Sequence, residues 1–257
     1  MNGRMAKKIG TGTYLLEHAP SAAAYAAIVG QMEGEGPLGA CFDYVEQDSY
    51  FGKDSWEQAE SELQRRTVGT ALQKAELTAQ DIDLILAGDL INQCTGTTYG
   101  LRGMGIPLLG LYGACSTMAE GLALGSILMD SGIARHIVAA TSSHFSTAER
   151  QFRFPLSYGG QRTPTAQWTC TASGAVVLAP CQNAPYLRAV TIGRIVDYGI
   201  TDANNMGAAM APAAADTILR FLADTGASPR EFDAIVTGDL GLIGSKLLCE
   251  ILQKEGV

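Results

Sequence analysis

An eight-residue segment occurs twice in the chain, and this duplication constrains the fold more than any other feature. Asp83–Leu90 reads DLILAGDL, and Asp233–Leu240 reads DAIVTGDL, 150 positions later. The same offset, without a gap, aligns the apolar positions of the helical segments that precede the two octamers, so that Leu72 falls on Leu222. We interpret the match in sequence, helix phase and connector length as a gene duplication.

The first copy alternates strand and helix patterns, which is typical of βαβ units and a buried parallel sheet. Ser55 and Gln58 have the form of a capping box at the start of a helix of about twenty residues. We expect a connection over 18–49 and a long loop over 142–167. The other expected elements are strands at 8–16, 81–88, 106–112, 136–141 and 173–178, and a helix at 116–131.

The second copy is expected to be incomplete in this chain. The first copy runs to about Pro180, whose equivalent by the same offset would be position 330, so about 70 residues of the second copy would be absent. We therefore expect a first half at 1–182 and a truncated second half at 183–257.

Composition excludes several classes of protein. The chain has 257 residues, of which 47% are hydrophobic, and a net charge of −8, so nucleic acid is not an expected partner. The longest apolar stretches span about six residues, which is too short for a transmembrane segment, and no signal peptide is expected. The six cysteines form no C-x-x-C pair and the three histidines lie far apart, so we expect neither a metal site nor a disulfide framework.

Cys115 lies where a nucleophile could be placed. The segment Gly113–Thr117 falls between an expected strand and a helix, and free N–H groups at a helix N-terminus favour a thiolate. Its small neighbours permit a sharp turn like a nucleophile elbow. On position alone, a reactive thiol and an inert one that fills a tight turn are equally supported.

Further polar residues follow other expected strands. Asp89 and Asn92 come after one strand, and His144 after another, and ligands of open α/β sheets bind at such strand ends. Asp89 could instead cap a turn, and His144 could be a hydrogen-bonded loop histidine. Arg150 belongs to an arginine-bearing stretch, 149–162, whose guanidinium groups suit an anionic ligand, a surface or a subunit interface.

Taken together, these residues resemble the thiolase superfamily, an α/β fold of two duplicated halves in αβαβα layers, and within it the family of stage V sporulation protein AD. The resemblance covers nearly the whole chain. It rests on the following stretches: Gly36–Gly39, Leu86–Leu90, Gly113–Thr117, Ala140–His144, Thr147–Arg153, Ser173–Leu178, Gly199–Asp202 and Met210–Ile218.

The resemblance implies a protein that binds dipicolinic acid, or its calcium chelate, for uptake into the developing spore. The implied partners are membrane-embedded spore transport proteins and a second copy in a homodimer, and no cofactor is implied. The implied location is the cytoplasmic face or periphery of the forespore inner membrane. By this resemblance Cys115 lines the pocket, and we expect the ligand to contact Cys115, Asp89, Asn92, His144 and Arg150.

Two alternatives remain. The first is a thiol-dependent acyltransferase of the ketoacyl synthase type, with Cys115 as nucleophile. The histidine or asparagine partners of such a cysteine would lie beyond Val257, so we favour a protein that is not an enzyme. The second is a scaffold subunit with a vestigial pocket.

Overall fold

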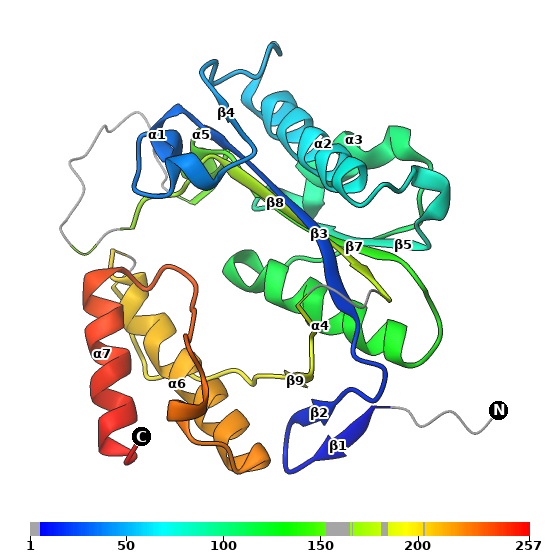
Figure 1. Ribbon diagram of the computed structural model, residues 1–257. Coiled ribbons are helices and arrows are strands. Elements are labelled where there is room, and N and C mark those ends of the chain that lie inside the picture. Colours follow the sequence, from blue (N-terminus) through cyan, green and yellow to red (C-terminus); the bar gives the residue numbers. More distant parts are fainter. Residues whose placement is uncertain (1–5, 153–164, 166, 181–184, 203) are drawn as a thin grey trace. The chain divides into compact units, whose positions relative to one another are not determined.

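The computed structural model describes residues 6–152, 165, 167–180, 185–202 and 204–257 (Figure 1). The chain divides into two compact units. Of the described residues, 17–152, 169–180 and 185–188 belong to the first unit. Those at 6–16, 165, 167–168, 189–202 and 204–257 belong to the second. We describe each unit by itself.

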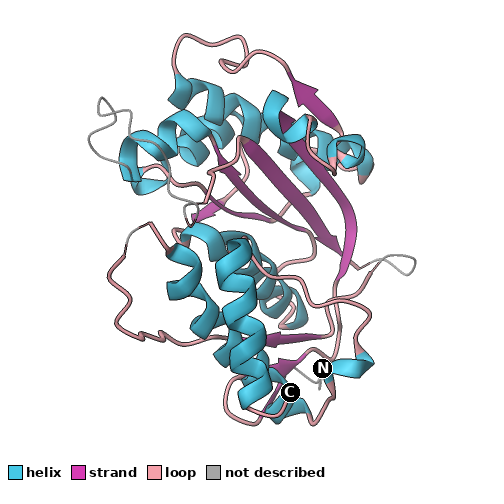
Figure 2. Ribbon diagram, turned by 90° about the vertical axis from the view of Figure 1, so that its left-hand side faces the viewer, coloured by secondary structure: helices cyan, strands magenta, loops and turns pink. Residues whose placement is uncertain are grey.

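The first unit is built on a sheet of six strands in the order β4-β3-β8-β7-β5-β6 (Figures 1 and 2). Strands β5, β6 and β7 are mutually parallel where they pair, and β8 runs antiparallel between β3 and β7. The strands are β3 (Ser21–Gly30), β4 (Tyr44–Glu46), β5 (Leu84–Gly88), β6 (Leu108–Gly110), β7 (Ile137–Ser143) and β8 (Ala172–Ala179).

Helices cover both faces of this sheet (Figure 1). Helix α2 (Trp56–Lys74) packs with α3 (Thr95–Leu101) on one face, and α4 (Thr117–Asp130) packs on the other. Two shorter helices, α1 (Gln31–Gly34) and α5 (Phe145–Phe152), complete the unit. Because helices lie on both sides, β5 and β7 are apolar and buried on both faces, as the sequence predicts for a parallel sheet.

Helix α2 begins and ends close to where the sequence predicts. The Ser55 hydroxyl accepts the backbone N–H of Gln58, which satisfies one of the free donors of the first turn. Leu63, Val68 and Ala71 are fully buried on its inner face. The predicted strands at 81–88, 106–112, 136–141 and 173–178 and the helix at 116–131 are confirmed, with shifted or shorter bounds.

Three expected segments differ from the structure. The single strand expected at 8–16 is a hairpin of β1 (Lys7–Ile9) and β2 (Thr13–Leu15), because Gly10 turns the chain with φ +52°. The expected connection 18–49 contains β3, which lies between β4 and β8. Its many alanines have little preference for strands, so the sequence does not indicate a strand there. The expected loop 142–167 contains the end of β7 and all of α5, and residues 153–164 lie outside the described part of the chain.

The second unit contains a small sheet and a helix pair. Strand β2 lies between β1 and β9 (Ala189–Thr191), and all pairings are antiparallel. Helices α6 (Met206–Thr225) and α7 (Gly241–Lys254) lie side by side (Figures 1 and 2). They approach closely at Gly207, where a Cβ atom would lie 2.2 Å from the backbone oxygen of Leu240, so only glycine fits.

The duplication is visible in local structure. The offset of 150 places α2 on α6, and the N-cap Ser55 on Asn205, which also caps its helix through the side chain. The 3₁₀ turns Ala79–Asp81 and Pro229–Glu231 also correspond, and each begins with a capping box. The octamers differ, however, because the first forms β5 whereas residues 234–238 form no strand.

Candidate functional site

The candidate site lies at one edge of the first unit's sheet. Because β5, β6 and β7 are parallel neighbours, the residues that follow them emerge at the same edge. Gly88 ends β5 so close to the next segment that a Cβ atom would lie 1.9 Å from the backbone oxygen of Leu111, so glycine is required there. This edge carries Asp89, Cys115 and His144, which the sequence singled out.

Three polar side chains from three segments form one cluster at this edge, which we call the amide–phenol cluster: Asn92, Tyr112 and Gln151. The Asn92 Oδ1 atom accepts hydrogen bonds from the Tyr112 hydroxyl at 3.2 Å and from Gln151 Nε2 at 3.0 Å. The Asn92 N–H donates to Gln151 Oε1 at 3.1 Å. The sequence pointed to Asn92 but not to its two partners.

The amide–phenol cluster adjoins an open hollow of about 540 Å³. The hollow is lined by Asn92, Gln93, Cys94, Thr98, Leu108, Gly110 and Tyr112. Gln93 and Cys94 hold φ values of +61° and +52°, which are uncommon for residues with a side chain. Such backbone strain gathers at functional positions, so we take this turn as a candidate contact for a ligand.

Asp89 is buried and fully engaged in local structure. Its carboxylate accepts the Ile91 N–H at 2.7 Å, the Thr97 N–H at 2.7 Å and the Thr97 hydroxyl at 2.6 Å. These bonds fasten the start of α3 to the end of β5. The arrangement matches the capping alternative that the sequence left open for this residue.

His144 is likewise buried, with 2% of its surface exposed. Its Nε2 atom lies 2.8 Å from the backbone oxygen of Ser49, and its Nδ1 atom accepts the Ser146 N–H at 3.1 Å. An imidazole that donates at Nε2 and accepts at Nδ1 is neutral, and burial lowers the pKa of His144. Both ring nitrogens are therefore occupied by the protein itself.

A buried carboxyl group that the sequence did not single out lies behind this edge. Glu60 on α2 is fully buried, and its carboxyl oxygens contact the Thr147 hydroxyl at 2.6 Å and the Ser142 hydroxyl at 3.2 Å. Burial, with a contribution from the nearby charge of Asp89, raises the pKa of Glu60 to about 7. The available signal was that Glu60 and Gln64 fall on the buried face of the predicted helix.

Cys115 lies in the 3₁₀ turn Ala114–Ser116, immediately before α4, and is exposed. Ala114 has φ +48°, a strained value for an alanine, so the turn that presents the thiol is sharp. Among the described residues, no hydrogen bond or ion pair joins Cys115 to Asp89, Asn92, His144 or Arg150.

Arg150 makes its contacts with α2. Its guanidinium pairs with the carboxylate of Glu57 and lies 5.6 Å from the ring centre of Trp56. The side chain remains half exposed. The neighbouring arginines Arg153 and Arg162 lie outside the described residues.

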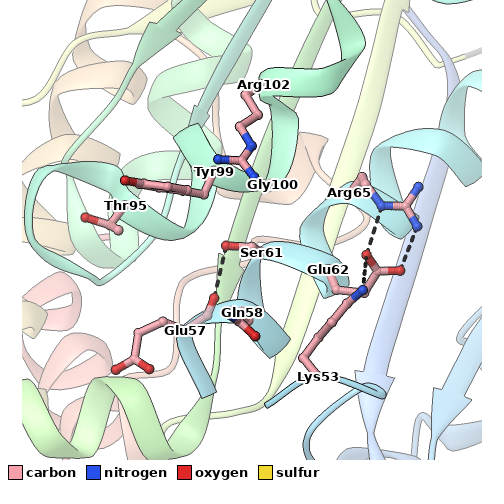
Figure 3. A pocket seen from close by; sticks show the side chains of 10 residues that line it. All are labelled: Lys53, Glu57, Gln58, Ser61, Glu62, Arg65, Thr95, Tyr99, Gly100 and Arg102. Carbon is pink, nitrogen blue, oxygen red and sulfur yellow. Dashed lines mark hydrogen bonds and ion pairs between the residues drawn. The ribbon is translucent and has the colours of Figure 1, made fainter. Parts of the chain in front are cut away.

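A second hollow, of about 630 Å³, lies between α2 and α3 (Figure 3). Its charges are largely paired, since Glu62 binds Arg65 through both carboxylate oxygens and also Lys53. These cations, with Arg66, lower the pKa of Glu62 to about 2. Among the described residues, Arg102 forms no ion pair and instead lies 5.1 Å from the ring centre of Tyr99.

Two further observations concern the described residues as a group. They contain no group of three or more His, Cys, Asp or Glu side chains that could hold a metal ion. None of the helices they form is both long enough and apolar enough to span a bilayer.

The described architecture is a thiolase-like α/β fold. It matches 3-oxoacyl-(acyl carrier protein) synthase III, FabH, from Xanthomonas oryzae with a TM-score of 0.64 and 15% identity, over 92% of this chain and 82% of that one. It also matches cerulenin-bound OleA from Xanthomonas campestris with a TM-score of 0.66 and 14% identity, over 93% and 82% of the two chains. At these identities the likeness concerns the fold alone.

Sequence comparison defines the family. The family model of stage V sporulation protein AD matches residues 10–257. Stage V sporulation protein AD of Bacillus subtilis is 45% identical over 250 residues, which cover 97% of this chain and 74% of that protein. The chain belongs to the stage V sporulation protein AD family.

Proposed function

We propose that the chain binds dipicolinic acid for its uptake into the developing spore and does not catalyse a reaction. Family membership, at 45% identity over 250 residues, carries this proposal. The amide–phenol cluster beside the 540 Å³ hollow supports it, because a preformed hollow with a few convergent polar groups suits a small planar ligand.

Charge distinguishes two forms of the ligand. Free dipicolinate is a dianion, and Arg150, the cation that the sequence singled out, is paired with Glu57. For Arg150 to bind the free dianion, it would have to give up its pairing with Glu57. The calcium chelate carries its own counter-charge, so we favour the chelate.

Calorimetric titration with dipicolinate, with and without Ca²⁺, tests this function. Replacement of Tyr112 by Phe removes only one hydroxyl, and we expect the Kd to rise about three- to tenfold, the usual effect of one hydrogen bond. Tyr44→Phe, on an exposed tyrosine of β4, is the matched control and should leave the Kd unchanged. Absence of heat at millimolar ligand in both forms would contradict the proposal.

A thiol-dependent acyltransferase using Cys115 is the second candidate. The strained turn at Ala114 and the exposed position of Cys115 before α4 favour it. We expect an activated thiol to react with iodoacetamide at neutral pH faster than Cys41 and Cys249, which are also exposed. Peptide mapping by mass spectrometry measures all three rates in one sample, and equal rates would count against the enzyme.

We further propose that the chain acts as a homodimer beside membrane-embedded spore transport partners, at the periphery of the forespore inner membrane. Membership of a sporulation family supports this location. Co-purification with those partners from sporulating cells tests it, and recovery of the chain only in the soluble fraction would contradict it.

A further inference from the structure

We propose that the second hollow, between α2 and α3, binds a small organic phosphate that carries an aromatic ring, which is the chemistry of a nucleoside monophosphate. Arg102 holds the phosphate group, and the ring of the ligand stacks on Tyr99 (Figure 3). This hollow is separate from the one beside the amide–phenol cluster, so the proposed function does not depend on it.

The walls of the second hollow are fixed by contacts within the protein. Gly100 of α3 lies so close to α2 that a Cβ atom would be 2.5 Å from the backbone oxygen of Ser61. On the α2 side, the Glu62 carboxylate accepts two hydrogen bonds from Arg65, at 2.6 Å and 2.9 Å, and one from Arg66 at 2.9 Å. The hollow is therefore preformed, which reduces the entropy that a ligand loses on binding.

Positive charge is in excess around this hollow, although the chain as a whole has a net charge of −8. Four cations lie in it or beside it: Lys53, Arg65, Arg66 and Arg102. Their ion pairs within the described part of the chain involve two carboxylates, those of Glu46 and Glu62. The third acid, Glu57, is paired with Arg150. Two positive charges are left over, which matches the charge of about −2 on a phosphate monoester at neutral pH.

Arg102 supplies the hydrogen-bond donors for the phosphate. Its side chain is exposed, and among the described residues it forms no ion pair. A guanidinium group presents its N–H donors as a planar fork that fits two phosphate oxygens at once. Lys53, on the α2 side, shares Glu62 with two arginines and adds a second positive charge facing the hollow.

Tyr99 supplies a surface for the aromatic ring of the ligand. It is 60% exposed, and the guanidinium of Arg102 lies 5.1 Å from the centre of its ring. An exposed aromatic side chain next to an arginine is the usual platform for a nucleobase. The volume of about 630 Å³ lies within the range of about 300 to 1,000 Å³ found for sites of small organic ligands. It exceeds what a phosphate group alone occupies, so the ligand has a further part.

A soluble ligand is favoured over a lipid headgroup, because the positive charges converge inside the hollow. Three of the four cations contact Glu62, whose side chain is only 10% exposed. A bilayer presents its phosphates on a broad surface, which does not enter a recess between two helices. A free molecule does.

Calorimetric titration of the chain with 5′-AMP tests the proposal without any dipicolinate. We expect binding to a single site, and binding about tenfold or more weaker for ribose 5-phosphate, which lacks the base, and for adenosine, which lacks the phosphate. Absence of heat with both AMP and GMP at millimolar concentration overturns the proposal. Inorganic phosphate that binds as tightly as AMP overturns it as well, because the ring would then contribute nothing.

Variants of the two exposed side chains assign the contacts. Arg102→Gln should weaken AMP binding about tenfold or more, and Tyr99→Ala about fivefold or more, whereas Tyr99→Phe keeps the ring and should keep the Kd. Arg135→Gln, on an exposed arginine just before β7, is the matched control and should bind as wild type does. Circular dichroism verifies that each variant is folded. An unchanged affinity in Arg102→Gln overturns the proposal.

Two further measurements separate this ligand from other anions. Sedimentation with vesicles that contain phosphatidylglycerol tests the lipid source: vesicle binding that is lost in Arg102→Gln, in a chain that does not bind AMP, overturns the proposal in favour of a headgroup. Saturating dipicolinate should leave the Kd for AMP unchanged, and competition between the two would show that they share a site. A chain that binds AMP but not dipicolinate contradicts only the proposed function.

Discussion

At the scale of single residues, Glu60 makes the free energy of unfolding depend on pH in an unusual direction. Its pKa is about 7 in the folded chain and 4.5 for an unperturbed glutamate, so the folded state holds the proton more strongly. Stability is therefore highest below the unfolded pKa and falls as pH rises through the folded one. Glu62 and His144 have the opposite influence, because the pKa of each is lowered in the folded chain. These two residues therefore make the fold less stable as pH falls.

Glu60→Gln should therefore stabilise the chain at alkaline pH. The shift of Glu60 corresponds to roughly 3 kcal/mol, so the variant should be more stable than wild type by up to about that amount at about pH 8 and about equal to it at about pH 4.5. Urea unfolding across this range measures the difference, and the contributions of Glu62 and His144 cancel in it. A difference that does not grow with pH would show that Glu60 is ionised in the folded chain.

The positions of single site residues could be predicted from the sequence only in part. Asp89, Asn92, Cys115 and His144 stand next to strands, so their place at one edge could be predicted from strand ends. The partners of Glu60 could not, because Ser142 and Thr147 are 82 and 87 positions away. Only the fold brings such distant hydroxyls to a carboxyl group.

At the scale of elements, the two helix caps related by the duplication should be interchangeable. Ser55 and Asn205 each accept a backbone N–H of the first helical turn through the side chain. Ser55→Ala should lower the free energy of unfolding by about 1 kcal/mol, and Ser55→Asn, which copies the second helix, should leave it nearly unchanged. Thermal and urea unfolding of the two variants test this, and equal losses would mean that asparagine does not replace the serine cap of α2.

Elements with a clear period or cap could be predicted, and those that depend on their neighbours could not. Helix α2 has both a serine cap and apolar residues at helical spacing. Strand β3 is mostly alanine, a residue with little preference for strands, and it is extended because β4 and β8 pair with it on both sides. Helix α5 lies in a polar stretch whose sequence carries no strong signal for a helix. It is held instead by the contact of Thr147 with Glu60 on α2.

At the scale of the whole molecule, the duplicated octamer shows that strand formation requires partners. In the first unit, β5 pairs with β6 and β7, and its residues Ile85 and Leu86 are buried. In the second unit, Ile235 and Val236 occupy the equivalent positions, yet residues 234–238 form no strand, and Val236 is 89% exposed. Similar sequences thus give different structures, because a strand is stabilised by its neighbours as well as by its own residues.

The edge of the first unit's sheet is the surface on which we expect the proposed homodimer to form. Strand β6 ends the strand order, and its backbone pairs only with β5 among the described strands. Leu109, 49% exposed, and Tyr112, 54% exposed, add apolar surface beside it. Unpaired strand edges of this kind pair readily with another chain, and a two-fold axis would place two copies of β6 side by side.

Leu109→Lys should therefore shift the chain toward monomer, because a charge on each of two facing strands repels the other. Sedimentation velocity over a range of concentrations measures the change, with Leu38→Lys as the matched control on an exposed leucine away from this edge. We expect wild type and the control to be dimers at about 10 μM and the Leu109 variant to dissociate at least about tenfold more readily. A wild-type chain that stays monomeric at every concentration would contradict the homodimer, and a variant as dimeric as wild type would place its interface elsewhere.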